Sequence, residues 1–149
     1  MADITFDLDG EDAFKRAMAA KGEAIVAAAT RAVGDSISAV HRTMVELLRV
    51  YSHPMGTPTP SPPGHPPALV TGSLIRSIHE RGPEVLGPII TGSVGPTIVY
   101  ARIQELGGWA GRDHRSHLPP RPYVKPTVAI EGPRAYQRLV SAVARAVAA

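Results

Sequence analysis

The sequence predicts an α+β fold in which a long N-terminal helix and a C-terminal helix pack on a small antiparallel sheet, with a proline-rich extended arm. Three observations predict it. One apolar stripe with helical spacing runs over 11–49, a second lies near the C-terminus, and β-branched segments with glycine and proline turns lie between them. The 149 residues are about one domain's length, so we expect a single domain over 1–149.

Composition and charge exclude several classes of protein. Hydrophobic residues make up 44% and charged residues 19% of the chain, which is enough apolar material for a core and too little charge for a disordered chain. The absence of cysteine excludes disulfides, thiolate metal sites and cysteine nucleophiles. No apolar stretch reaches the roughly 18 residues of a membrane span, and the acidic N-terminus lacks a secretory-signal pattern, so we expect no membrane contact and no export.

The N-terminal part predicts a short strand and then a long helix. Apolar and polar residues alternate over 3–8, and Asp9-Gly10 favours a turn. Over 11–49 the apolar residues step mostly by three or four, the period of an amphipathic helix about 60 Å long that also offers a surface for oligomer contacts. Gly22 and Gly34 each cost this helix about 1 kcal/mol relative to alanine, and either can mark a bend. The stripe comprises Phe14, Met18, Ile25, Ala29, Val33, Ile37, Val40, Met44, Leu47 and Tyr51.

A proline-rich segment follows the long helix. Residues 52–67 contain seven of the fifteen prolines of the chain. Each proline fixes φ and removes a backbone donor, so we expect neither a helix nor a central strand here. The segment is predicted to be extended and able to project from the body, either as a flexible linker or as an arm that docks on a neighbouring subunit.

A hairpin is predicted for the middle of the chain. Thr71 or Ser73 can cap a short helical turn that precedes it. β-branched residues are concentrated over 84–94, the residues of 74–81 mix apolar and polar types, and Gly82-Pro83 between them favours a turn. We therefore expect two antiparallel strands that are joined at this turn.

The remaining elements are a short helix, two irregular segments and a final helix. Apolar residues fall on one face over 97–106, and Gly107-Gly108 supplies a C-cap. Residues 109–117 are predicted as a polar loop, and the prolines of 118–126 exclude regular hydrogen bonding there. Pro133 is expected at the first position of the final helix. The apolar stripe of that helix comprises Tyr136, Leu139, Val140, Val143 and Val147.

The sequence offers little support for catalysis. His114 and His117 beside Asp113 have a spacing that could hold a metal, but a site needs three or four ligands and no helical His-Glu-x-x-His motif is present. Phosphate-binding loops and a nucleophile elbow are also missing. We therefore expect no catalytic, cofactor or metal site and no enzymatic activity. The carboxylates of the second half are too scattered for an acid and base pair, and they are Glu80, Glu84, Glu105, Asp113 and Glu131.

Basic residues are concentrated in the last third, where residues 101–149 hold eight basic and three acidic side chains. A cluster of basic and aromatic side chains there could cradle a single-stranded nucleic acid. The alternative, which we favour, is that its arginines pair with acidic groups of a neighbouring subunit, such as Asp7, Asp9, Glu11 and Asp12. The cluster comprises Trp109, Arg112, Arg115, Arg121, Tyr123 and Lys125.

Four segments occur in a characteristic order. They are Ser61-Pro-Pro-Gly-His-Pro-Pro, Thr71-Gly-Ser-Leu-Ile-Arg-Ser-Ile, Val94-Gly-Pro with Tyr100-Ala-Arg-Ile-Gln-Glu-Leu-Gly-Gly, and Leu118-Pro-Pro-Arg-Pro-Tyr-Val-Lys-Pro. This order resembles the neck and minor tail-component family of tailed bacteriophages, the tail completion and head-tail joining proteins of long-tailed phages. The resemblance covers residues 11–148. The chain departs from the family pattern in having Tyr123 and Leu106 where phenylalanine is usual, and Gly132-Pro133 near the last helix.

The resemblance implies a small α+β subunit that forms a ring, commonly of six copies, at the head-tail joint of the virion. Its expected partners are further copies of itself, neighbouring neck proteins and the tail tube or its terminator, with genomic DNA passing through the lumen. Assembly would take place in the cytoplasm of the bacterial host. One alternative is a tail terminator that caps the tail tube, and another, from a different class, is a nucleic-acid-binding accessory protein that uses residues 109–125.

On this basis we nominate two sets of side chains. The first set, expected at subunit interfaces, comprises Pro62, Pro63, Pro66, Pro67, Leu74, Tyr100, Glu105, Arg121 and Tyr123. Within it, Arg121 and Tyr123 are expected either to position the last helix or to form a subunit contact. The second set, expected to face the lumen or a nucleic acid, comprises Arg112, Arg115 and Lys125.

Overall fold

The computed structural model describes residues 11–56 and 61–149, and it confirms the predicted α+β fold. The predicted strand over 3–8 lies outside the described residues. Two long helices and two small antiparallel hairpins make up most of the structure. In chain order the elements are α1 (Glu11–Leu47), α2 (Ser73–Arg76), β1 (Ile78–Leu86), β2 (Ile89–Pro96), α3 (Ala101–Leu106), β3 (Gly108–Ala110), the 3-10 turn η1 (Arg112–His114), β4 (Ser116–Leu118) and α4 (Val124–Ala148).

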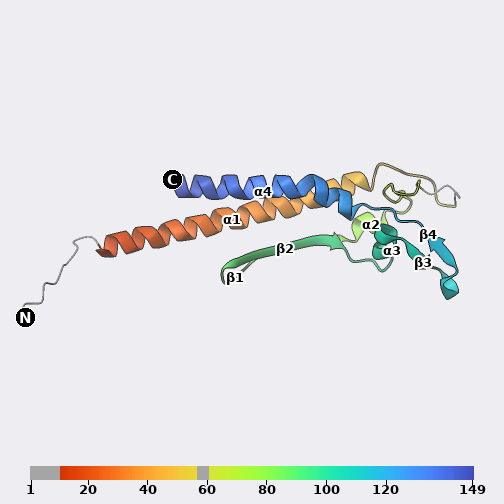
Figure 1. Ribbon diagram of the computed structural model, residues 1–149, viewed down its shortest axis with the longest axis horizontal. Helices are drawn as coiled ribbons and strands as arrows, with labels where there is room; N and C mark the ends of the chain where they lie inside the picture. The colour runs from red at the N-terminus through yellow and green to blue at the C-terminus, as the bar shows by residue number, and fades with distance from the viewer. Residues whose placement is uncertain (1–10, 57–60) are drawn as a thin grey trace, which may run out of the picture.

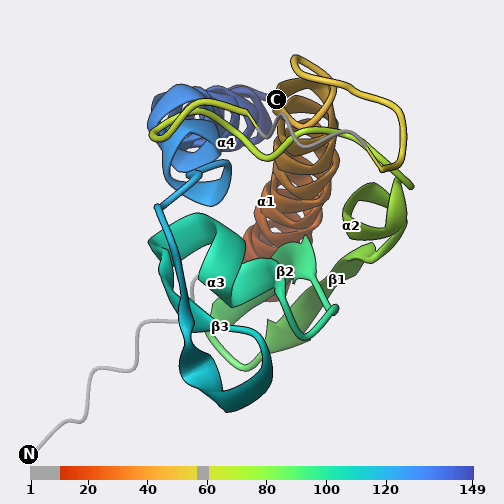
Figure 2. The same cartoon turned by 90° about the vertical axis from the view of Figure 1, so that its right-hand side faces the viewer.

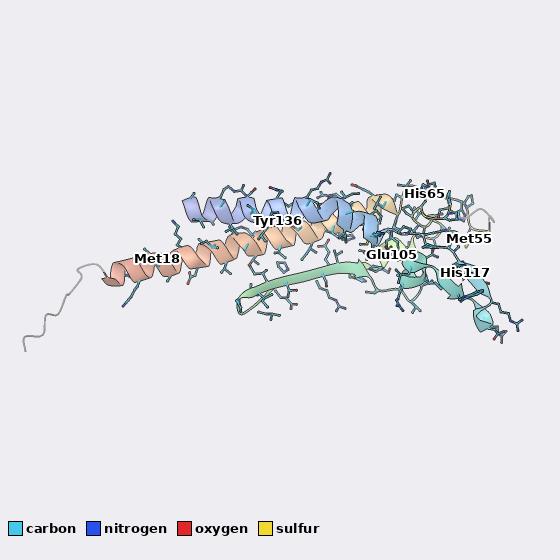
Figure 3. The ribbon with its side chains drawn as sticks, viewed as in Figure 1. Met18, Met55, His65, Glu105, His117 and Tyr136 are labelled. Carbon is cyan, nitrogen blue, oxygen red and sulfur yellow. The ribbon has the colours of Figure 1, made fainter. Side chains whose placement is uncertain are left out.

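Helix α1 lies between α4 and the β1–β2 hairpin along the length of an elongated molecule (Figure 1). The view from the end of the molecule shows the same order, with α3 and β3 below the start of α4 (Figure 2). The first turns of α1 extend beyond both neighbours, and every side chain from Lys15 to Ala24 is exposed. Met18 is 54% exposed and points away from the body in Figure 3. The N-terminal end of α1 therefore does not pack against α4 or the β1–β2 hairpin.

The core forms where the two long helices meet the first hairpin. Met44 and Leu48 from the end of α1 pack with Ile78 of β1 and with Tyr123, which precedes α4. Ala29, Ile37 and Met44 of the predicted helical stripe are buried, whereas Met18 is exposed. Ala28 and Ala32, which the prediction did not include, are buried where α1 faces α4. The buried residues of α1 and of its C-terminal end are Ala28, Ala29, Ala32, Ile37, Ala39, Met44 and Leu48.

The first hairpin is antiparallel, as predicted, but its turn is at Gly87-Pro88 and not at Gly82-Pro83. Gly82 and Pro83 lie inside β1, at a shift of register between Arg81 and Glu84. Gly82 has a φ of 85°, which a residue with a side chain rarely adopts. The Gly-Pro pair therefore makes a bulge within the strand, and the pairing continues beyond it.

The hairpin is held against α1 by close packing and by one polar cluster. A Cβ atom on Gly92 would lie 2.3 Å from Cδ1 of Ile37, so the backbone of β2 approaches the helix directly. Nearby, Glu80 accepts a hydrogen bond of 3.1 Å from the Ser38 hydroxyl, and its other oxygen lies 2.6 Å from Nδ1 of His41. These contacts fix the position of the hairpin along the helix.

Three further predictions are corrected by the structure. The short helix begins at Ala101 and not at residue 97. Residues 109–117, predicted as a loop, include most of the small β3–β4 hairpin, in which Trp109 pairs with His117. The last helix begins at Val124, so Pro133 lies in its interior and not at its first position. Pro133 is tolerated inside the helix because the carbonyl that loses its hydrogen-bond donor is that of Ala129, which is exposed and can bind water.

Candidate functional site

The segments that carry the family resemblance meet at the broad end of the molecule. Residues 61–67, 101–107 and 118–125 contact one another there, and we call this region the motif junction. Its backbone is joined by hydrogen bonds from Gly64 N to the Pro120 carbonyl, 3.0 Å, and from Arg121 N to the Gln104 carbonyl, 2.7 Å. Three stretches that are separate in the sequence therefore form one connected unit.

Glu105 caps the N-terminus of α4 from a different helix. Its Oε2 accepts hydrogen bonds from the backbone N–H groups of Tyr123 and Val124 at 2.7 and 2.8 Å, and its Oε1 accepts one from Lys125 at 2.9 Å. The first four N–H groups of a helix have no partner inside it, and here the fourth position is Pro126, which has no N–H. One carboxylate thus satisfies this end completely, and its negative charge also suits the helix dipole. Figure 3 shows Glu105 at this junction.

Arg121 and Tyr123 are buried inside the motif junction. Arg121 is 7% exposed, and its Nε donates a hydrogen bond of 3.2 Å to the carbonyl of Ser61. Tyr123 is 1% exposed, and its hydroxyl donates a 3.2 Å hydrogen bond to the carbonyl of Ala101. Burial, and to a lesser extent the nearby Glu105 and Tyr100, raise the pKa of Tyr123 to about 12. Both side chains therefore position the start of α4 within one chain.

Gly107 allows the chain to pass close to itself at this junction. It has a φ of 70°, and a Cβ atom there would lie 2.8 Å from the carbonyl oxygen of Leu118 and 2.8 Å from the nitrogen of Pro120. Both atoms are backbone, so they cannot move aside as a flexible side chain could. The glycine after α3 is therefore needed for the contact between α3 and the segment that leads into α4.

Described residues of the proline-rich segment contact their own chain at two places. Ser52 forms a parallel bridge with Leu69, and the carbonyl of the buried Ser61 accepts a hydrogen bond from Arg121. Pro67 is buried and Pro66 is half-buried, whereas the remaining nominated prolines, Pro62 and Pro63, are exposed. The bond from Arg121 therefore links this segment to the residues that lead into α4.

The nominated interface residues therefore divide into two groups. Glu105, Arg121 and Tyr123 are engaged inside the chain, and Leu74 packs against the core cluster. Tyr100 is 39% exposed and remains accessible.

The nominated lumen residues are exposed. Arg112 begins the 3-10 turn between β3 and β4, Arg115 follows this turn, and Lys125 is in the first turn of α4. Trp109 is 61% exposed, and its ring meets that of His117 edge-on with centroids 5.0 Å apart. Arg121, placed with these residues in the predicted basic cluster, is separated from them by its burial.

A buried ionic cluster joins α4 to α1. Glu131 accepts hydrogen bonds from Arg134 and Arg138, both 2.8 Å long, and from the hydroxyl of Thr43, 3.1 Å long. These bonds, that of Arg138 first, lower the pKa of Glu131 to about 2 although burial opposes the shift. Sequence reasoning treated this carboxylate as isolated. The spacing in the sequence could have revealed this cluster. The two arginines follow Glu131 by three and seven residues, which places all three side chains on one face of a helix.

Large apolar side chains are exposed at both ends of the β layer. Val85, Leu86 and Ile89 surround the turn of the first hairpin, at one end (Figure 1). At the other end, Val99 is 97% exposed and lines an open hollow with Leu106 and Trp109. Apolar side chains that gather on a surface in this way usually mark contacts with another molecule.

The described residues do not show a metal centre or a membrane helix. Within residues 11–56 and 61–149, histidine and acidic side chains do not gather in groups of three or more that could bind a metal ion. No helix in that part of the chain combines the length and hydropathy needed to cross a bilayer. Comparisons with protein-family models, curated proteins and solved structures find no match for this chain.

Proposed function

We propose that the chain is a structural protein of a tailed-phage virion, which forms a ring at the head-tail joint and surrounds the path of the DNA. The observation that carries this proposal is the exposure of large apolar side chains at both ends of the β layer. A surface at one end that fits a different surface at the other end gives head-to-tail contacts, and such contacts close into rings when the rotation between copies is suitable.

The chemistry of the two ends is compatible with such a contact. The hairpin turn presents Leu86 and Ile89, 60% and 61% exposed, as a protruding apolar tip. The far end presents the hollow beside Val99 and Trp109. Inserting two aliphatic side chains into this hollow would remove apolar surface from water, at about 25 cal/mol per Å² buried. Three of the four motifs support the proposal differently, because they form the hydrogen-bonded junction next to this hollow.

The direct test is the location of the protein in virions. Mass spectrometry of purified particles should detect it, and cryo-electron microscopy should show a ring of its density at the head-tail joint. A position at the distal tip of the tail tube would favour the terminator function. Absence from mature particles would refute the virion proposal.

A nucleic-acid-binding accessory function is the second candidate, and the exposed Trp109 supports it. An exposed indole flanked by Arg112 and Arg115 offers a stacking surface within a basic surrounding. If this function is correct, the affinity for a single-stranded oligonucleotide should fall steeply with salt and with Arg112→Ala and Arg115→Ala. Arg76→Ala, which removes an exposed arginine elsewhere, is the matched control.

A further inference from the structure

A groove with an apolar floor and basic rims lies between α1 and α4. The two helices diverge toward the free end of α4 (Figure 1), and the groove opens along this part. Its floor consists of alanines, of which Ala28 and Ala32 are buried and Ala142 and Ala146 are half-buried. Small floor residues leave room for larger apolar side chains of an occupant.

The rims of the groove carry an excess of positive charge. Arg31 stands on α1, and Arg134, Arg138 and Arg145 stand on α4, whereas Asp35 is the one acidic side chain among the described residues that line the groove. Glu131 already pairs with Arg134 and Arg138, so the positive charge left on the rims comes mainly from Arg31 and Arg145. The groove therefore suits an occupant with apolar side chains on one face and carboxylates on the other.

The chain itself contains a segment with this chemistry. Residues 3–9, which we call the acidic segment, lie outside the described residues, and no basic side chain occurs before Lys15. In an extended conformation, Ile4, Phe6 and Leu8 share one face, and the acidic Asp3, Asp7 and Asp9 share the other. Asp7 and Asp9 would stand about 6.6 Å apart along a strand. The rise between Arg134 and Arg138 along the helix is close to this, at about 6 Å.

The acidic segment cannot fill the groove of its own chain. The stretch of α1 that lines the groove runs from Ala28 to Asp35. Along the helix axis these residues lie about 26 and 36 Å from Glu11, at 1.5 Å per residue. From Glu11 back to Asp3 a fully extended chain spans at most about 29 Å, so only its first residue would reach the edge of the groove. The occupant must come from another molecule.

We infer that the groove between α1 and α4 binds the acidic segment of a second copy of this chain. The apolar face of the segment lies on the alanine floor, and its carboxylates pair with the arginines of the rims. The inference rests on the proposed function only in requiring that copies associate, and it adds a second contact to the one proposed for the hairpin tip. Because one copy gives a segment and another gives a groove, the contact is head-to-tail and can propagate around a ring.

A charge exchange between two full-length variants tests the inference. In the first variant, Arg31→Glu and Arg145→Glu make the groove acidic, and in the second, Asp7→Lys and Asp9→Lys make the segment basic. In each variant alone, the groove and the segment carry charges of the same sign, so its copies should associate at least about tenfold more weakly than those of the wild type. An equimolar mixture pairs each segment with an opposite groove, so association should return. The measurement is sedimentation velocity over a range of concentrations.

Controls separate this contact from folding and from other occupants. Circular dichroism should show that every variant is folded, and Arg42→Glu with Arg49→Glu, both exposed and outside the groove and the hollow, should leave association unchanged. Variants that associate alone as the wild type does, or a mixture that does not regain association, would overturn the inference. The inference would also be overturned if an oligonucleotide bound the wild type and not the first variant while the association between copies stayed unaffected. A monomeric wild type would overturn it too, while the position in the virion is tested separately on particles.

Discussion

Replacing Glu105 with glutamine should destabilise the monomer by an amount that can be worked from its three hydrogen bonds. Oε2 accepts two backbone N–H groups and Oε1 accepts one. A glutamine retains one acceptor oxygen, so its amide N–H₂ must face at least one N–H donor. The lost bond to a charged group costs about 1.5–3 kcal/mol, and removing the charge from the helix N-terminus costs about 0.3–1 kcal/mol. We expect the free energy of unfolding to fall by about 2–4 kcal/mol.

Urea unfolding followed by far-UV circular dichroism measures this loss. With a slope of about 2 kcal/mol per molar urea, the midpoint of Glu105→Gln should drop by about 1–2 M. Glu84→Gln is the matched control, because it makes the same chemical change at an exposed position of β1. Its midpoint should stay within about 0.3 M of the wild type, as is usual for a surface substitution.

Equal midpoints for the two variants would refute the capping argument. If Glu105→Gln left the stability of the monomer unchanged but weakened association, Glu105 would instead belong to the subunit interface, as its sequence motif predicted. The two readouts separate the intramolecular role from the intermolecular one.

Three further predictions concern other contacts. The folded-state pKa of Glu131 is about 2, below its ordinary 4.5, so its contribution to stability is present above pH 4.5 and is lost as the pH falls toward 2. Urea midpoints in this range should decline less for Glu131→Gln than for the wild type, and equal declines would contradict the assignment. Gly92→Ala should cost about 1–3 kcal/mol, because the new Cβ meets Cδ1 of Ile37, and adding Ile37→Val, which removes that atom, should recover part of the loss in thermal unfolding. Tyr123→Phe should cost about 0.5–1.5 kcal/mol, since the carbonyl of Ala101 loses its donor, and an unchanged melting temperature would show that this bond contributes nothing.

The long elements of the fold could be predicted because their periodicity is a property of the local sequence. The apolar stripe located the start of α1 at Glu11, and the helix ends at Leu47, two residues before the predicted end. Helix α4 was recognised, but its start was misplaced because Pro126 and Pro133 suggested a break. Pro126 occupies the first turn, where no intrahelical donor is needed. A proline therefore does not by itself locate a helix boundary.

Features that depend on pairing between distant segments could not be predicted in the same way. Gly82-Pro83 and Gly87-Pro88 are equivalent turn signals in the sequence, and only the pairing of Ile78 with Pro96 places the turn at the second. The strands β3 and β4 are three residues long each, too short for a period to be recognised. At the motif junction, the sequence identified Glu105 as part of a motif, but its role depends on backbone groups almost twenty residues away.

The packing of α1 against α4 makes the fold depend on a segment that is synthesised long after α1. Thr43 and Glu131, which are bonded in the native structure, are separated by 88 residues in the sequence. During translation, the face of α1 that carries Ala28 and Ala32 therefore stays uncovered until α4 leaves the ribosome. Contacts of such long sequence separation form slowly, and exposed apolar surface attracts chaperones and other nascent chains in the meantime. Premature termination before Val124 would leave that face open, so a stable subunit requires that α4 has been synthesised.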